Sequence, residues 1–168
     1  MSVFFEKWEG LGNHFVVLES LPEDTTVQEL CDARRGVGAD GVLLLDRSPP
    51  SMTIFNADGS RAAMCGNGLR CAARWFAERG VGLEGGIATD SGTLRVGEVG
   101  EGVAVEVGRA KRVGAGQFMG FRYVSVDIGN PHAVFLDPAA SFDLESVGAA
   151  MQTHPDFPDG VNVPEVRS

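Results

Sequence analysis

The chain has 168 residues, enough for one large domain or for one domain and the beginning of another. Its 43% hydrophobic and 22% charged residues are ordinary for a folded globular protein and exclude wholesale disorder. Acidic residues outnumber basic ones by 23 to 14, and the resulting net charge of −9, without a long basic run, disfavours nucleic acid as a partner.

The N-terminal segment carries acidic residues and no continuous apolar stretch, so it lacks the pattern of a signal peptide. Apolar runs elsewhere fall far short of the roughly 18 residues that indicate a membrane helix. The three cysteines form an odd set without the density of a disulfide scaffold, which suits a reducing compartment. We therefore expect a cytoplasmic protein without a membrane partner.

Short β-rich runs between Gly, Pro, Asn and Asp predict that most of the chain is sheet. The first helix is expected to start near Thr25, where Thr25 and Gln28 fit a capping box. Its apolar residues are Val27, Leu30 and Cys31. The predicted strands are residues 14–19, 41–46, 52–56, 93–96, 103–107, 123–128 and 133–137.

The most informative helix is predicted from just after Gly66 to about Glu78, with Gly80 as its stop. Its apolar residues recur at helical spacing, as Leu69, Ala72, Ala73 and Phe76. Further apolar residues lie on the flanks of this face. We therefore expect the helix to be enclosed on more than one side, as if inside a curved sheet.

The Gly-rich stretch after this helix keeps the alternation of a hairpin as far as Val107. Residues 109–117 are then interpreted as a connector. We accordingly place a boundary near Gly116, between a first domain of residues 1–116 and a partial second domain of residues 117–168.

A third helix is predicted to open at Asp143. One face carries Leu144, Val147 and Met151. Gly148 interrupts the pattern, so the helical signal is weaker here than in the second helix.

Residues 36–41, GVGADG, match the Gly-rich pattern of dinucleotide-binding sites literally. A Rossmann fingerprint follows a strand and opens a helix, whereas this segment follows a helix and precedes a strand. It is therefore interpreted as a tight turn. A metal site is also disfavoured, because the cysteines and histidines provide neither a C-x-x-C pair nor two histidines one helical turn apart.

Cys65 opens the CGNG segment at the predicted N-terminus of the second helix, where unpaired N–H groups and the helix dipole favour a thiolate. A substrate carboxylate could use the same donors, and Gly66 and Gly68 allow close approach to the backbone. From the residues alone, Cys65 can equally be a buried small hydrophobic side chain. Cys71 and Cys31 fall inside predicted helices and are expected to serve packing.

Polar residues mark three further segments. Asn56 opens a predicted tight turn over residues 56–59. Asn130 and His132 flank a proline where a turn meets a strand. Asn162 lies in an otherwise apolar run, where its side chain needs a partner or a ligand. Each segment taken alone is also compatible with an ordinary turn or strand.

Several motifs resemble, in order and across nearly the whole chain, those of the diaminopimelate epimerases: GLGNHF, RRGVGADGVLLL, IFNADGSRAAMCGNGLRCAARWF, DSGTLRV, IGNPHAVFLD and FPDGVNV. The resemblance implies an α+β fold of two similar domains, each a mixed sheet rolled around a central helix. On this resemblance, the second domain is expected to be incomplete in this chain. It also implies an enzyme without cofactor or metal that interconverts LL- and meso-diaminopimelate, in lysine and peptidoglycan precursor synthesis, by proton transfer between two cysteines. A homodimer is compatible with this resemblance.

On this resemblance, Cys65 corresponds to the first catalytic cysteine and His132 to a histidine near the reacting carbon. The implied substrate-binding residues are Asn13, Asn56, Gly66, Asn67, Asn130 and Asn162.

The chain also departs from the family pattern. His14 stands where the family usually has aspartate, and Gly41 where some relatives have a side chain that contacts the substrate. The family's second Cys-Gly motif does not occur before Ser168, so the isolated chain is expected to be an inactive or incomplete portion. The alternatives are an amino-acid-binding module without catalysis and a related racemase or isomerase of the same fold.

Overall fold

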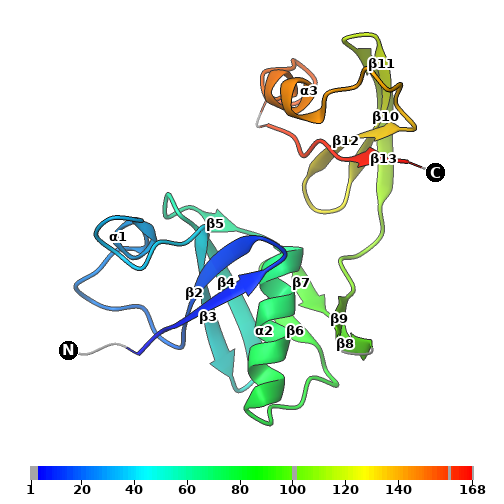
Figure 1. Cartoon of the computed structure of the whole chain (residues 1–168). Helices are drawn as coiled ribbons and strands as arrows, with labels where there is room; N and C mark the ends of the chain where they lie inside the picture. The colour runs from blue at the N-terminus through cyan, green and yellow to red at the C-terminus, as the bar shows by residue number, and fades with distance from the viewer. Residues whose placement is uncertain (1–3, 100–101, 159, 168) are drawn as a thin grey trace. The chain divides into compact units, whose positions relative to one another are not determined.

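The computed structural model describes residues 4–99, 102–158 and 160–167. The chain forms two compact units, Met1–Val107 and Gly108–Ser168 (Figure 1). The expected boundary at Gly116 falls inside strand β10 (Lys111–Phe118), because this segment is a paired strand and not a connector. None of the helices in the described residues is long and apolar enough to cross a membrane.

The first unit is built on a seven-stranded mixed sheet in the order β1-β2-β3-β4-β6-β7, with β5 paired to β4. The β2–β3 and β4–β6 pairs are parallel and the others are antiparallel. Strands β8 and β9 form a separate antiparallel hairpin, as the sequence predicts. The strands are β1 (Glu6–Gly10), β2 (Asn13–Leu18), β3 (Gly41–Arg47), β4 (Pro50–Asn56), β5 (Arg61–Ala62), β6 (Ile87–Thr89), β7 (Gly92–Leu94), β8 (Val96–Val99) and β9 (Gly102–Val105).

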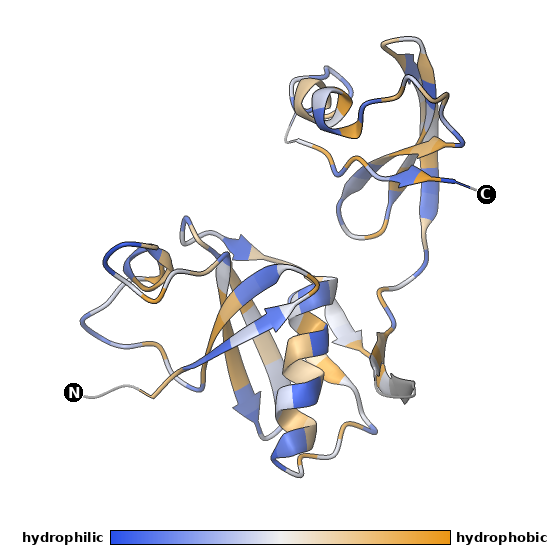
Figure 2. Cartoon of the chain, viewed as in Figure 1, coloured by the Kyte–Doolittle hydropathy of each residue, from blue (hydrophilic) through white to orange (hydrophobic). Residues whose placement is uncertain are grey.

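Helix α2 (Gly66–Glu78) has the bounds that the sequence predicts and lies against one face of the sheet (Figure 1). Hydrophobic and hydrophilic bands alternate along it, as expected for an amphipathic helix (Figure 2). Val103 and Val105 of the β8–β9 hairpin pack against the same core, so the expected enclosure on more than one side is confirmed. Gly80 follows the helix end with φ +69°, a conformation that glycine adopts without steric cost. The predicted face, Leu69, Ala72, Ala73 and Phe76, is buried.

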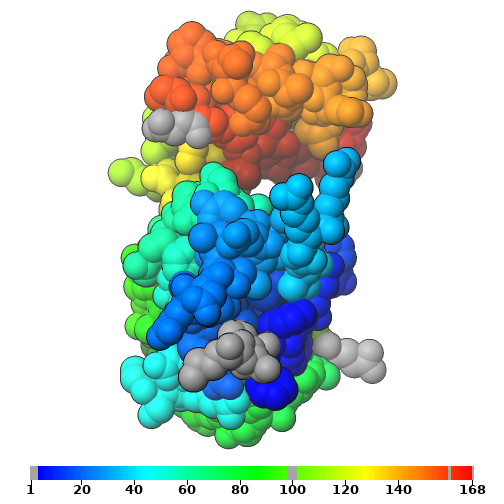
Figure 3. Space-filling view, turned by 90° about the vertical axis from the view of Figure 1, so that its left-hand side faces the viewer, coloured from blue at the N-terminus to red at the C-terminus, as the bar shows by residue number. Residues whose placement is uncertain are grey.

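Helix α1 (Val27–Cys31) packs on the opposite face of the sheet (Figure 1). Its capping box is formed by Thr26 and Glu29, one residue later than predicted, because Thr26 is the residue that adopts the extended N-cap conformation. The central residues of β2 and β3 are therefore covered on both faces. In Figure 3, the residues around α1 (blue) form much of the visible surface of the first unit.

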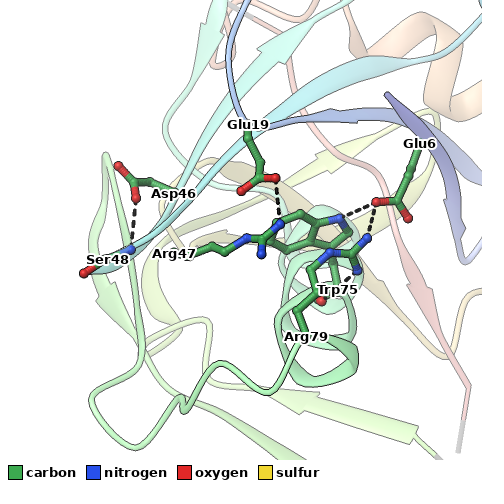
Figure 4. Close-up of polar contacts among 7 residues, drawn as sticks. All are labelled: Glu6, Glu19, Asp46, Arg47, Ser48, Trp75 and Arg79. Atoms are coloured by element: carbon green, nitrogen blue, oxygen red, sulfur yellow. Dashed lines mark hydrogen bonds and ion pairs between the residues drawn. The ribbon is translucent and has the colours of Figure 1, made fainter. Parts of the chain in front are cut away.

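A polar cluster fastens β1 to the C-terminal half of α2 (Figure 4). The Trp75 Nε1 group donates to the Glu6 carboxylate at 2.9 Å, and Arg79 forms an ion pair with the same carboxylate. The guanidinium groups of Arg79 and Arg47 lie 4.1 and 5.0 Å from the centre of the Trp75 ring, within cation–π range. Glu19 holds Arg47 in place with an ion pair of 2.7 Å. This arrangement fixes the end of α2 that is distant from Cys65.

The second unit has a four-stranded sheet in the order β10-β11-β12-β13. The first three strands form an antiparallel meander, and β13 runs parallel to β12. The strands after β10 are β11 (Phe121–Asp127), β12 (Pro131–Leu136) and β13 (Glu165–Val166). Together the two units give the α+β fold with mixed sheets that the sequence motifs imply.

Helix α3 (Leu144–Met151) packs on the second sheet, with Val147 and Met151 buried as predicted. Leu144 was expected on the same face but is 41% exposed, because it occupies the first turn, where the helix has not yet reached the core. Asp143 is the N-cap as predicted, but its carboxylate accepts a hydrogen bond from the Ser146 hydroxyl and not from the helix backbone.

Candidate functional site

Cys65 is the N-cap residue of α2, as the sequence predicts for the start of this helix. Its backbone is extended, with φ −144° and ψ 112°, and its Sγ accepts a hydrogen bond from the Gly68 N–H at 3.3 Å. A sulfur atom in this position receives an N–H donor that the helix itself cannot satisfy. The side chain is half-buried and remains accessible. The arrangement therefore directs the Gly68 N–H and the positive end of the helix dipole toward Sγ.

The two glycines of CGNG have different surroundings. A Cβ on Gly68 would lie 3.0 Å from Leu43 Cδ2 and 3.6 Å from Cys65 Sγ, so α2 packs closely on β3 here and a side chain would displace Leu43. A Cβ on Gly66 would meet only ordinary contacts, at 3.5 Å from Arg70 and 3.7 Å from Val107. Packing within the first unit therefore does not explain why residue 66 is glycine. The absence of a side chain at Gly66 leaves the backbone next to Cys65 uncovered.

Asn13 and Asn67 meet beside Cys65 although 54 residues separate them in the sequence. The Asn67 Nδ2 group donates to Asn13 Oδ1 at 2.9 Å. Asn13 begins β2 and Asn67 lies in the first turn of α2. The structure therefore brings three of the predicted site residues, Asn13, Cys65 and Asn67, to one end of α2, with Gly66 between the last two.

Asn56 ends β4 and opens the predicted turn, and its Nδ2 group donates to Ser60 Oγ at 3.0 Å. Asp40 joins this turn to the start of β2. The Asp40 carbonyl accepts from the Ala57 N–H at 3.2 Å, and its carboxylate accepts from the His14 N–H at 2.7 Å. Asp40 of the GVGADG segment thus hydrogen-bonds to the residues that follow Asn13 and Asn56.

GVGADG lies between α1 and β3, so the predicted order of helix before strand is confirmed. The helix ends at Cys31, and a turn over residues 33–35 follows it. At the end of the segment, a Cβ on Gly41 would lie 2.5 Å from the Phe55 carbonyl oxygen. The pairing of β3 with β4 therefore excludes a side chain at residue 41 in this chain.

The predicted site residues of the second unit also lie together. The His132 Nδ1 atom is 3.0 Å from the Asn130 carbonyl oxygen, and an isolated parallel bridge joins His132 to Asn162. The Asn162 Nδ2 group donates to the Pro131 carbonyl at 3.3 Å. Asn162 faces outward between the buried Val161 and the half-buried residue that follows it, which explains a polar residue in this apolar run.

The other two cysteines are packing residues, as predicted. Burial, followed by the charges of Cys65 and Glu9, raises the pKa of the Cys71 thiol to about 11. Burial, together with the charge of Asp40, also raises the pKa of Cys31. Both environments disfavour a thiolate, so neither sulfur is suited to remove a proton near neutral pH.

Arg70 is a further residue of this site that was not predicted, and its Nη1 group donates to Asn67 Oδ1 at 3.3 Å. The signal was present, because residues three apart on a helix are neighbours on its surface. Within the described residues, no group of three His, Cys, Asp or Glu side chains is arranged to hold a metal ion.

Comparisons with known proteins agree with the sequence motifs. A family profile described as diaminopimelate epimerase matches residues 5–113. The diaminopimelate epimerase of Carboxydothermus hydrogenoformans is 35% identical over 95% of this chain and 69% of its own length. That of Alkalilimnicola ehrlichii is 36% identical over 97% of this chain and 70% of its own length.

Solved structures show the same fold at low sequence identity. A hydroxyproline epimerase from Agrobacterium vitis, crystallised with trans-4-hydroxy-L-proline, matches with a TM-score of 0.62 at 14% identity. The match covers 95% of this chain but 64% of that protein, so this chain spans a little under two thirds of its structural neighbour. The resemblance in fold that the motifs implied is confirmed.

Proposed function

Because this chain belongs to the diaminopimelate epimerase family, a family of isomerases, we propose that Cys65 is an acid/base thiol that exchanges a proton at the α-carbon of diaminopimelate. The observation that carries this proposal is the environment of the sulfur. Cys65 alone among the three cysteines is not buried, and it caps the N-terminus of α2. The reaction would serve lysine and peptidoglycan precursor synthesis. The cytoplasmic location and the homodimer remain predictions from the sequence.

The proposed reaction is a proton exchange with inversion at one carbon. A thiolate removes the α-hydrogen from one face, which leaves the bonding electron pair on carbon and the proton on sulfur. A thiol on the opposite face then donates its proton to the same carbon. The base ends as a thiol and the acid as a thiolate, so the exchange needs no pyridoxal phosphate, metal or other reactant.

We assign substrate binding in the first unit to the groups around Cys65. Gly66 leaves room for a ligand to approach the first backbone N–H groups of α2, which suit a carboxylate. Asn13 and Asn67 offer side-chain amides beside them. Amide groups can orient an amino acid without adding net charge. The remaining proposed contacts are Asn56, Asn130, His132 and Asn162.

The second acid/base group of the proposed reaction is neither Cys31 nor Cys71. Both are buried, and the pKa of each thiol is raised, so neither can present a sulfur to a substrate carbon. We therefore expect the 168-residue chain alone not to convert LL- to meso-diaminopimelate at a useful rate. Loss of one proton-transfer partner costs about 10² to 10⁴ in rate.

Binding can be tested in this chain by NMR titration with three related ligands. LL-diaminopimelate should shift the backbone signals of residues 66–68 and the side-chain amide signals of Asn13 and Asn67. Lysine lacks the distal carboxylate, and 1,5-diaminopentane lacks both carboxylates. Equal shifts with 1,5-diaminopentane, or shifts confined to other residues, would contradict the assigned site.

Catalysis can be tested by chiral chromatography of diaminopimelate after incubation in D₂O. A longer chain that carries a second Cys-Gly motif should convert LL to meso substrate, and Cys65→Ser should reduce that rate by about 10² to 10⁴. Binding without any Cys65-dependent conversion in the longer chain would indicate the alternative, an amino-acid-binding module. Fast conversion by the 168-residue chain would show that the second acid/base group lies within it.

A further inference from the structure

Three side chains form a directed chain of hydrogen bonds beside Cys65. The Arg70 Nη1 group donates to Asn67 Oδ1 at 3.3 Å, and Asn67 Nδ2 donates to Asn13 Oδ1 at 2.9 Å. All three side chains are half-buried. Arg70 and Asn67 lie on the first two turns of α2, whereas Asn13 starts β2, so the chain of bonds joins the helix to the sheet.

The direction of these bonds follows from Arg70. A side-chain amide has one oxygen that accepts and one NH₂ group that donates, and the two ends have nearly the same shape. A guanidinium group can only donate, so it must face the oxygen of Asn67. The NH₂ group of Asn67 then faces Asn13 and must meet its oxygen. One arginine therefore determines the orientation of two amides.

We propose that Arg70 is a positioning residue that sets the polarity of the Asn13–Asn67 pair. With Arg70 in place, both amide oxygens are engaged, and the Asn13 NH₂ group and the second Asn67 N–H are left to face a ligand beside Cys65. The pair then presents donors, which complement a carboxylate. Without Arg70, half-turns of both amides can reverse the hydrogen bond, so that Asn13 donates to Asn67. The Asn67 NH₂ group then faces Arg70's former position, and the Asn13 oxygen replaces a donor toward the ligand.

The inference rests on the proposed function only for the identity of the ligand. The orientation of the two amides is a property of the unliganded chain and can be measured there. Arg74 provides a matched control, because it lies one turn further along the same helix and pairs with Glu78 at 3.2 Å instead of with an asparagine.

The experiment measures water exchange of the asparagine side-chain protons by NMR in ¹⁵N-labelled chain without ligand. Within the Asn13–Asn67 pair of the unaltered chain, the slowly exchanging side-chain proton should belong to Asn67. In Arg70→Met it should shift to Asn13 or disappear from both residues. Arg70→Lys retains a donor at this position and should restore protection at Asn67, and Arg74→Met should leave the pattern unchanged.

A slow proton that stays on Asn67 in a folded Arg70→Met variant would overturn the proposal. If that variant does not fold, the proposal is tested instead with Arg70→Lys and with the guanidinium signals of the unaltered chain. Protected Arg70 Nη protons with cross-peaks to Asn67 support the proposal, and rapid exchange of those protons overturns it. Failure of LL-diaminopimelate to bind while the exchange pattern is as expected would refute the proposed function and leave the role of Arg70 intact.

Discussion

Alkylation of the folded chain should modify Cys65 first and leave Cys71 and Cys31 almost unmodified near neutral pH. The thiolate is the reactive form of cysteine, so the rate depends on the ionised fraction and on access to the sulfur. Cys65 is accessible and receives the Gly68 N–H, whereas Cys71 is 4% exposed and Cys31 is 7% exposed.

The magnitude follows from the pKa of Cys71, which burial and the charges of Cys65 and Glu9 raise to about 11. At pH 8, a thiol with that pKa is ionised to only about 0.1%. Restricted access lowers its rate further. Between pH 8 and pH 10 the ionised fraction of Cys71 rises about 100-fold, so its labelling should accelerate steeply in that interval.

The assay is a time course with iodoacetamide from pH 7 to pH 10, followed by mass-spectrometric mapping of the three cysteine peptides. Cys65→Ser should remove the fast phase and leave Cys71 and Cys31 slow near neutral pH, because both remain buried. In guanidinium chloride, where burial is lost, the three cysteines should label at similar rates. Faster labelling of Cys71 or Cys31 than of Cys65 in folded protein at neutral pH would refute the assignment of the accessible thiol.

Stability should fall as pH rises from 9.0, the ordinary pKa of Cys71, to about 11, because the unfolded chain releases this proton first. The loss is on the order of 2 kcal/mol and should be absent when Cys71→Ala is unfolded in urea over the same pH range. Gly68→Ala should destabilise the chain by about 1–3 kcal/mol, because the added Cβ crowds Leu43 of β3. Gly66→Ala should leave the unfolding midpoint nearly unchanged and weaken diaminopimelate binding. Equal unfolding midpoints for the two variants would contradict the packing argument. Burial alone would raise the pKa of Glu6. Hydrogen bonds from Trp75, Trp8 and Arg79 outweigh burial and lower this pKa from its ordinary value of 4.5. The stability that Glu6 contributes is therefore present above pH 4.5 and lost at lower pH, and Trp75 fluorescence during acid unfolding should report this loss. Glu6→Gln should weaken the pH dependence of unfolding. An acid transition that is the same in Glu6→Gln and in the unaltered chain would contradict this role of Glu6.

Local signals were sufficient where an element depends on its own residues. The bounds and buried face of α2 were predictable, because apolar residues recur at helical spacing and Gly80 supplies the left-handed residue that ends the helix. The placement of Cys65 at the start of this helix follows from the same pattern. The capping box of α1 was shifted by one residue, since Thr25 and Thr26 offer the same side chain and only the backbone conformation distinguishes them.

Strands that depend on a partner were not predictable in the same way. Strand β10 contains Gly114 and Gly116 and resembles a connector, yet β11 provides hydrogen bonds along its length. A Cβ on Gly116 would lie 2.5 Å from the Tyr123 hydroxyl oxygen, so glycine here serves close packing and does not indicate a flexible linker. Strands β1, β5, β6 and β13 were missed as well, because they are short and the sheet, not their composition, orders them.

Helix α2, the turns and the residue types of the candidate site were predictable from the sequence, because helix periodicity, turn glycines and the CGNG segment act over a few residues. Which of these residues meet depends on the tertiary packing. It set Asn13 against Asn67 across 54 residues and made Arg70 the donor that orients both amides. It also distinguished the accessible Cys65 from the buried Cys71, six residues later on the same helix. Burial and hydrogen-bond direction depend on distant segments packed against a residue, and no local pattern contains that information.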